Sequence, residues 1–227
     1  AVTVGVGRGS ELCILVRNGE ALEVADRLTS VVFDKTGTLT RGKPAVTDII
    51  AAEIDERTLL AIAAGVEKNS SHPLADALVR EAEARGIRPE NSAEFTTFGG
   101  KGVFARVLGE EVYIGNRALM AEHGVIIPPE LDSQVTALEQ DGKTGVIVAI
   151  AGAPGGVIAV ADTIKTTTPE AVRELEAMGL SVAIITGDNQ RTAEAIAQQA
   201  GIDTVFAGVL PGGQADAVAA MQAEGYV

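Results

Sequence analysis

The stretch Asp34-Lys35-Thr36-Gly37-Thr38-Leu39-Thr40 decides the fold and the chemistry that this chain can support. It follows the apolar run Ser30–Phe33, which predicts a buried strand that ends on an acidic residue and a glycine-bearing turn. An aspartate with an ordinary pKa near ~4 is ionised at neutral pH, so it can attack phosphorus without a general base. Its repulsion from an anionic phosphate is about 4 kcal/mol at about 4 Å and an effective dielectric near 20. Lys35, backbone amides of the turn and a Mg²⁺ ion would offset that repulsion.

A second strand-and-turn unit lies about 150 positions further along the chain. The run Ser181–Ile185 predicts a buried strand, Thr186-Gly187-Asp188-Asn189 predicts a polar turn, and a helix is expected from Gln190 to Ala200. Strand, glycine turn and helix in this order are typical of a parallel βα unit. Because open parallel sheets bind ligands at the carboxyl ends of their strands, we expect Asp34 and Thr186 to face one pocket.

The residues between these units predict a second domain inserted into the first. Between the units, helices are expected at 58–64 and 74–85 and short strands at 103–107 and 111–114. Two more helices, at 168–178 and 211–224, are expected on either side of the second strand-and-turn unit. We therefore predict an α/β fold in which a parallel-sheet domain, residues 1–43 and 160–227, is interrupted by an α+β domain with an antiparallel sheet, residues 44–159.

One uncharged stretch, residues 144–161, is nearly long enough for a membrane helix. Ala153-Pro154-Gly155-Gly156 lies within it and predicts a turn, so we expect a β-hairpin with strands at 146–150 and 157–160. The net charge of −13 argues against nucleic acid and against an anionic membrane surface as partners. Cys13 is the only cysteine, which excludes an internal disulfide and a cysteine metal cluster.

The heptapeptide resembles the phosphorylation signature of P-type ATPases, whose phosphorylation domain is haloacid dehalogenase-like. This resemblance implies that Asp34 is the phosphoryl acceptor, assisted by Lys35, and that Thr36 contacts phosphate and Mg²⁺, so that Asp34 and Thr36 form the metal site. Thr186-Gly187-Asp188 is similar to the second motif of the family, with Thr186 bound to phosphoryl oxygens. Related phosphatases carry an aspartate where this chain has Thr36, so the phosphoenzyme is expected to persist.

Ser70-Ser71-His72-Pro73-Leu74-Ala75 resembles the Ser-x-His-Pro-Leu motif of heavy-metal-transporting members. Pro73 suits a first helical position with Ser71 or His72 as the cap, which would present the imidazole to an adenine. The resemblance implies an ATP site, and the residues expected to form it are Glu67, Ser70, His72, Pro73, Gly100, Gly102, Val103, Gly115, Asn116 and, in the hinge Asp162–Lys165, Asp162. His123 lies outside these motifs and is expected on the surface.

The pattern of residues 14–23 looks more like copper-exporting members than zinc or cadmium ones. The resemblance thus implies the part of a pump that lies at the cytoplasmic face of the cell membrane, with ATP and Mg²⁺ as ligands. Its expected partners are the membrane and actuator domains of the parent pump and a heavy-metal ion, Cu⁺, bound outside this chain.

Two departures from the family bear on activity. Gln214 stands where the family has a lysine that neutralises the phosphoryl group, and Val227 precedes the expected Gly-Asp-Gly-x-Asn-Asp motif, which supplies magnesium ligands. We expect a chain that binds ATP but autophosphorylates poorly, because one lost stabilising group typically costs about 10²–10³ in rate. Two alternatives stay open: a non-catalytic nucleotide-binding module, and a stand-alone haloacid dehalogenase-like phosphohydrolase.

Overall fold

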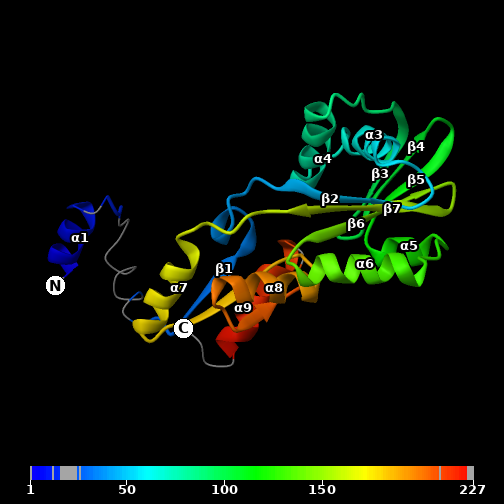
Figure 1. The fold of residues 1–227 in the computed structure, drawn as a ribbon. Coiled ribbons are helices and arrows are strands. Elements are labelled where there is room, and N and C mark those ends of the chain that lie inside the picture. Colours follow the sequence, from blue (N-terminus) through cyan, green and yellow to red (C-terminus); the bar gives the residue numbers. More distant parts are fainter. Residues whose placement is uncertain (1, 12, 16–24, 26, 210, 224–227) are drawn as a thin grey trace.

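The chain folds around two separate β-sheets (Figure 1). The computed structural model describes residues 2–11, 13–15, 25, 27–209 and 211–223. The strands are β1 (Ser30–Asp34), β2 (Ala45–Ala51), β3 (Ser92–Phe98), β4 (Gly102–Val107), β5 (Glu110–Gly115), β6 (Thr144–Ile150), β7 (Ala153–Ala161), β8 (Ser181–Ile185) and β9 (Thr204–Phe206). The helices are α1 (Val2–Glu11), α3 (Glu56–Glu67), α4 (Pro73–Ala84), α5 (Arg117–Glu122), α6 (Pro129–Gln140), α7 (Thr168–Ala177), α8 (Gln190–Ala200) and α9 (Gln214–Ala223), with short turns η1 (Lys35–Leu39) and η2 (Pro211–Gly213).

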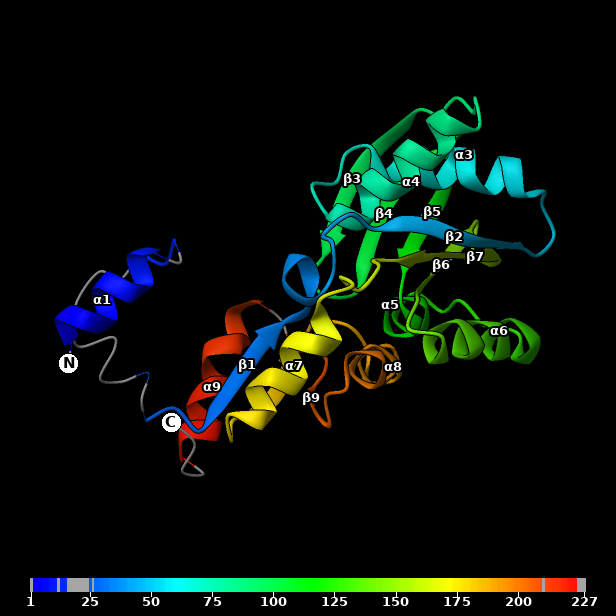
Figure 2. The same cartoon turned by 60° about the vertical axis from the view of Figure 1, so that its left-hand side comes forward.

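The smaller sheet is parallel, with the order β1-β8-β9, as the two strand-and-turn units predict. Helices α7 and α8 cover one face, where Val172 and Ile196 pack on Val182 and Ile184. Asn189 begins α8 by accepting a hydrogen bond from the amide of Thr192. Helix α9 lies on the opposite side of β1 from α7 (Figure 2).

The larger sheet has six strands in the order β2-β7-β6-β5-β4-β3, all antiparallel. Helices α3 and α4 cover one face through a core that includes Leu59, Leu78 and Ile158. Helices α5 and α6 cover the other face through Leu119 and Val135. Each face thus has its own apolar core, in keeping with the alternation of side chains along its strands. Within the described residues, none of the helices combines the length and the apolar character that crossing a bilayer requires.

The hairpin predicted in the uncharged stretch is present, but its predicted turn is wrong. The chain reverses at Ala151 and Gly152, whose φ values are 50° and 81°, as a two-residue hairpin turn requires. Pro154 lies inside β7 and pairs with Ala149, beside a register shift that accommodates a residue without an N–H group. Gly156 is needed because a Cβ there would lie 2.3 Å from the carbonyl oxygen of Ile50.

The chain crosses between the two sheets twice, along neighbouring segments. Ala45, the first residue of β2, pairs with Ala161, the last residue of β7. An isolated antiparallel bridge joins Thr40 to Ile164. The predicted helices at 58–64, 74–85, 168–178 and 190–200 correspond to α3, α4, α7 and α8. Residues 16–24, on which most of the copper pattern falls, lie outside the described residues, as do 224–227 at the predicted end of the last helix.

Candidate active site

Asp34 is the last residue of β1 and lies at the carboxyl edge of the parallel sheet. It is in register with Ile185, the last residue of β8. Thr186 directly follows Ile185 and therefore lies at the same edge of the sheet. Val32 and Asp34 point to the α9 side of the sheet, and with Gln214 they line a hollow of about 420 Å³. Asp34 is exposed, and no hydrogen bond or ion pair engages its carboxylate within the described part of the chain. The predicted common edge for Asp34 and Thr186 is therefore present, and Gln214 lies on the same hollow as Asp34.

The turn η1 after Asp34 is held by residues on the return crossing. Gly37 has a φ of 77°, and its amide donates to the hydroxyl oxygen of Thr40 at 3.1 Å. The buried Thr40 hydroxyl donates to Oδ2 of Asp162 at 2.6 Å. Lys165 Nζ donates to the carbonyl oxygen of Gly37 at 2.8 Å. The hinge motif therefore positions the turn that carries Lys35 and Thr36.

The carboxylate of Asp162 is occupied within this hinge. Besides the Thr40 hydroxyl, it accepts hydrogen bonds from the amides of Gly42 at 3.0 Å and Lys43 at 3.2 Å. Asp162 thus lies with the Asp34 turn, and no hydrogen bond or ion pair within the described residues joins it to the other residues predicted to contact nucleotide.

Three of the residues predicted around phosphate contact one another directly. Lys35 Nζ forms a half-buried ion pair with Oδ2 of Asp188. The buried hydroxyl of Thr186 donates to the same oxygen at 3.0 Å and accepts from the amide of Asp188 at 3.2 Å. A residue from the other sheet joins them, since the Thr144 hydroxyl donates to Oδ1 of Asp188 at 3.2 Å. Asp188 therefore gathers a cation and two hydroxyl groups beside the strand end that carries Asp34.

The oxygen atoms at this edge suit Mg²⁺, the ion that the resemblance implies at Asp34 and Thr36. Carboxylate and carbonyl oxygens are the hard donors that Mg²⁺ prefers. Within the residues that the structure describes, no group of three or more His, Cys, Asp or Glu side chains is arranged to hold a metal ion. The residues present thus fit an ion that would keep water and phosphate oxygens as most of its ligands.

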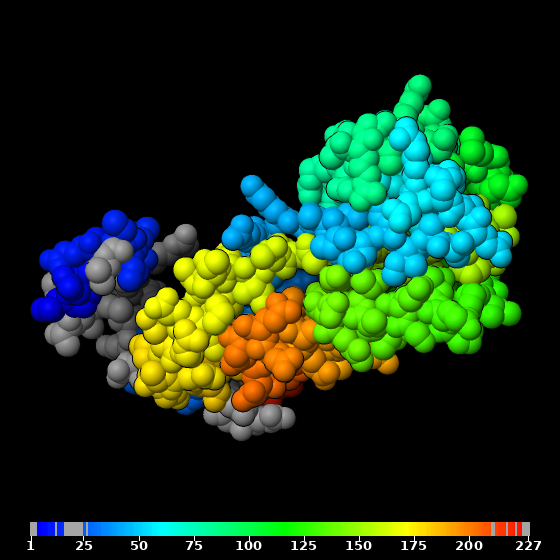
Figure 3. Space-filling view, in the orientation of Figure 1, coloured from blue at the N-terminus to red at the C-terminus, as the bar shows by residue number. Residues whose placement is uncertain are grey.

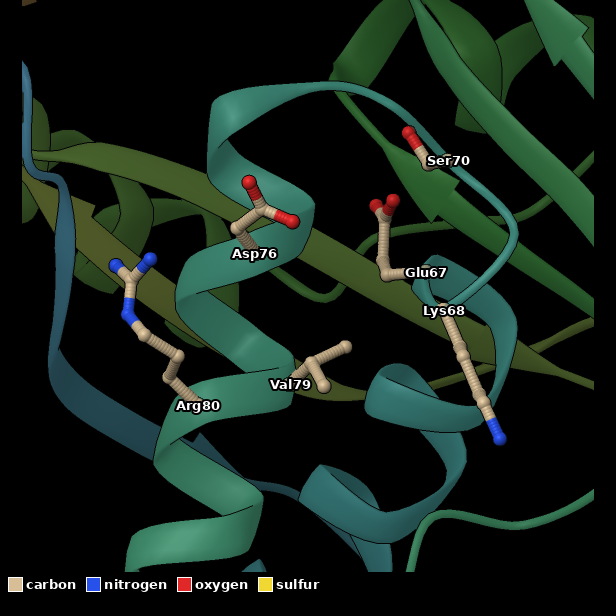
Figure 4. A pocket seen from close by; sticks show the side chains of 6 residues that line it. All are labelled: Glu67, Lys68, Ser70, Asp76, Val79 and Arg80. Atoms are coloured by element: carbon tan, nitrogen blue, oxygen red, sulfur yellow. The ribbon is translucent and has the colours of Figure 1, made fainter.

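Glu67, at the carboxyl end of α3, is a buried carboxyl group beside a separate hollow of about 310 Å³ (Figure 4). Burial raises the pKa of Glu67 to about 7, against a smaller opposing effect of its hydrogen bond with Ser70. Lys68, Asp76 and Arg80 also line this hollow. Sequence reasoning missed these three, although the i, i+4 spacing of Asp76 and Arg80 places them on one side of α4.

His72 caps α4, as one of the two predicted possibilities. Its Nδ1 accepts a hydrogen bond from the amide of Leu74 at 3.2 Å, and Pro73 occupies the first helical position. The amide of His72 donates to the hydroxyl oxygen of Ser70 at 3.2 Å. The second ring nitrogen, Nε2, is then the one that carries the proton in the neutral imidazole and can meet a ligand.

The predicted glycine loop has an internal structural reason for its small residues. A Cβ on Gly102 would lie 2.1 Å from the carbonyl oxygen of Ile114, and a Cβ on Gly115 would lie 2.2 Å from that of Lys101. Asn116 ties the loop down, because its side chain donates to the carbonyl oxygen of Gly100 at 3.0 Å and caps α5. The Val103 side chain is buried in the core beneath α3 and α4. These glycines let two strands approach closely, whatever else the loop binds.

The turn between α3 and α4, with Glu67, Ser70 and His72, comes before β3 in the chain, and the glycine loop comes after it; these are two groups. Ser92, the first residue of β3, accepts a hydrogen bond from Asn69 at 2.9 Å, whereas Gly99 directly follows the last residue. Within the described residues no hydrogen bond, ion pair or ring contact joins the two groups. His123 is exposed, as predicted, and its ring stacks on Tyr113 with a centroid distance of 4.1 Å.

The parallel βα edge and the inserted antiparallel unit define the class of protein. The family model of haloacid dehalogenase-like hydrolases matches residues 28–227, and the chain belongs to this family. A probable copper-exporting P-type ATPase of Archaeoglobus fulgidus is 45% identical over 227 residues, which cover all of this chain and 28% of that protein. Probable copper-exporting P-type ATPase V of Mycobacterium tuberculosis is 46% identical over 228 residues, which cover all of this chain and 30% of that protein. The chain thus spans less than a third of the length of these relatives.

Solved structures agree with these relatives. The crystal structure of a zinc-transporting PIB-type ATPase in the E2.Pi state is 38% identical with a TM-score of 0.66, and the match covers 99% of this chain and 36% of that chain. A catalytic CPx-ATPase domain, at 24% identity and a TM-score of 0.66 over 93% of this chain and 73% of that one, shares the fold. The predicted resemblance to heavy-metal P-type ATPases and the predicted fold class are therefore confirmed.

Proposed function

We propose that this chain is the ATP-binding and phosphoryl-accepting part of a P-type ATPase that exports a heavy-metal ion, with Cu⁺ as the ion. The observation that carries the proposal is the exposed carboxylate of Asp34 at the carboxyl edge of the parallel sheet, next to Thr186 and the Lys35–Asp188 pair. The copper assignment rests on the relatives that are named copper-exporting P-type ATPases. The parent pump would hold this chain at the cytoplasmic face of the membrane, beside its membrane and actuator domains.

In the proposed reaction an Asp34 carboxylate oxygen attacks the γ-phosphorus of ATP. A bond forms between that oxygen and phosphorus, the bond to the bridging oxygen breaks, and ADP leaves with the electron pair. Lys35 and the Thr186 hydroxyl lie where they can turn from Asp188 to the phosphoryl oxygens. A bound Mg²⁺ would supply further positive charge to those oxygens. Thr36 has no carboxyl group to activate water, which favours a lasting aspartyl-phosphate.

The inserted unit supplies the proposed nucleotide site. Its members are Glu67, Ser70, His72, Pro73, Gly100, Gly102, Val103, Gly115 and Asn116. His72 supports this role, because its Nδ1 is occupied as a helix cap and its Nε2 remains to donate to an adenine nitrogen. Asp162 would act on the nucleotide indirectly, by holding the hinge.

Incubation with γ-³²P-labelled ATP and Mg²⁺, followed by an acid quench, tests the proposal. Label on the chain should be weak, stable to acid and released by hydroxylamine, and Asp34→Asn should abolish it. Gln214→Lys should raise the label by about 10²–10³, since it places a cation on the hollow that Asp34 lines. Gln222→Lys is the matched control, because Gln222 lines the same hollow further along α9.

The alternatives give different results in the same experiment. Label that survives Asp34→Asn refutes the assignment of the phosphoryl acceptor. Calorimetric binding of ATP with no label in either lysine variant supports the non-catalytic nucleotide-binding module, which the neutral Gln214 favours. Turnover of a simple phosphate monoester supports the phosphohydrolase.

A further inference from the structure

A polar contact joins the inserted unit to the phosphate motif. On the inserted side it comprises Glu139 of α6 and the following residues Gly142, Lys143 and Thr144. On the other side it comprises residues 188–196, the Asp188 turn and α8. We call this set the α6–α8 contact; Figures 2 and 3 show α6 lying directly against α8.

Glu139 is the centre of this contact, and its side chain is only 4% exposed. Its Oε1 accepts hydrogen bonds from Arg117 at 2.6 Å, within the inserted unit, and from Asn189 at 3.0 Å, across the contact. Its Oε2 accepts from Arg191 of α8 at 3.2 Å. A buried carboxylate placed between two guanidinium groups is stabilised only while those partners remain. Glu139 therefore favours the arrangement in which α6 and α8 touch.

The segment after α6 extends the contact to the phosphate motif itself. The buried Thr192 hydroxyl donates to the carbonyl oxygen of Lys143 at 3.0 Å, and Thr144 donates to Asp188 at 3.2 Å. Gly142 has a φ of 77°, and a Cβ there would lie 3.2 Å from the Ile196 side chain. The turn is thus fitted closely to α8.

Asp188 belongs both to the α6–α8 contact and to the group with Lys35 and Thr186 that follows the two strand ends. One of its oxygens accepts from Thr144, and the other binds Lys35 and Thr186. A phosphoryl group at Asp34 would bring negative charge that attracts Lys35 and the Thr186 hydroxyl and repels the Asp188 carboxylate. Asp188 would then lose the partners that hold it where Thr144 reaches it.

We propose that the α6–α8 contact is an interdomain latch, held closed by Glu139, and that a phosphoryl group on Asp34 opens it through Asp188. The trigger rests on the proposed function, whereas the latch rests on the contacts of Glu139 alone. The latch gives the phosphate pocket a direct means of releasing the nucleotide-binding unit after transfer.

The latch is tested by a distance between two spin labels measured by double electron–electron resonance. Labels at Glu83→Cys on α4 and Glu176→Cys on α7, both exposed positions, report on the two units in a chain with Cys13→Ser. The unmodified contact should give one narrow distance. Glu139→Gln should raise the population of longer distances at least about tenfold, because the hydrogen bonds that the carboxylate accepts from Asn189 and Arg191 across the contact are weakened.

Two further variants distinguish loss of the contact from a general effect of mutation. Arg191→Gln leaves Arg117 and Glu139 paired inside the inserted unit, and it should raise the longer distances by about threefold or more. Glu130→Gln, an exposed change on the same helix, should leave the distance unchanged. An unaltered distribution in Arg191→Gln and in folded Glu139→Gln would overturn the latch.

Beryllium fluoride with Mg²⁺, a mimic of the aspartyl-phosphate, tests the trigger. Fluorine-19 NMR establishes whether the mimic is bound. With the mimic bound, the spin labels should show the longer distances in the chain whose α6–α8 contact is not mutated. A bound mimic with an unchanged distance overturns the trigger. Failure of the mimic to bind counts against the proposed function and overturns the trigger with it. The distances measured without the mimic, in the unmodified contact and in the Glu139 and Arg191 variants, still test the latch by itself.

Discussion

Glu67 makes the stability of the inserted unit depend on pH. Glu67 is 6% exposed, and burial raises its pKa from 4.5 to about 7. Between these values the folded chain holds a proton that the unfolded chain has lost, so the free energy of unfolding falls as pH rises from about 4.5 to about 7. Each pH unit in that window corresponds to about 1.4 kcal/mol, which gives a penalty of about 3 kcal/mol above pH 7.

The substitution Glu67→Gln removes that penalty, because glutamine keeps the shape and a hydrogen-bonding group near Ser70 but carries no charge. Urea unfolding should show a free energy of unfolding higher by about 3 kcal/mol at pH 8 and nearly unchanged at pH 4.5. Glu83→Gln, an exposed change on the adjacent helix α4, should have little effect at either pH. An equal effect of Glu67→Gln at both pH values, or none at pH 8, would refute the argument from burial.

Two further changes test the loop and the hinge. Gly102→Ala puts a Cβ 2.1 Å from the carbonyl oxygen of Ile114 at a φ of 145°, and should lower the free energy of urea unfolding by about 3 kcal/mol or more. Gly99→Ala, with nothing within 4 Å, should cost less than about 1 kcal/mol, so equal costs would contradict the steric reason. Asp162→Ala removes the acceptor of the hinge amides and should speed tryptic cleavage between η1 and β2 by about tenfold. Asp203→Ala, a change at an exposed position, should leave the rate of cleavage unchanged. Equal rates of cleavage in the two variants would contradict the role of Asp162 in holding the hinge.

Local sequence patterns predict the elements around Asp34 well. Apolar runs before Asp34 and Thr186 specify β1 and β8, and a polar cap with a closing glycine specifies α8. The sequence pattern misplaces the hairpin turn, because Ala151 adopts a positive φ without the Asn-Gly or Asp-Gly signal, while Pro154 and Gly155 lie in a strand beside a register shift.

Contacts between distant segments could not be predicted in the same way. In the sequence, Glu139 resembles a solvent-facing helical residue. Only the packing of α8 against α6 buries its side chain and adds the ion pair with Arg191. The contact between Thr144 and Asp188 likewise joins residues 44 positions apart, on different sheets. Motifs identify which residues can do chemistry, but tertiary packing decides which of them share a partner.

The paired crossings between the sheets have a mechanical consequence. The amide of Arg41 donates to the carbonyl oxygen of Thr163 at 2.9 Å, and the amide of Lys165 donates to that of Leu39 at 2.9 Å. A short antiparallel bridge therefore joins the two crossings again next to η1, beyond the end of the β2–β7 ladder. A two-stranded ribbon bends easily out of its plane and resists shear within it, unlike two independent tethers. Any rotation of the inserted unit therefore acts on two hydrogen-bonded crossings at once, and the return crossing is also bonded through Lys165 to Gly37 in the turn that follows Asp34.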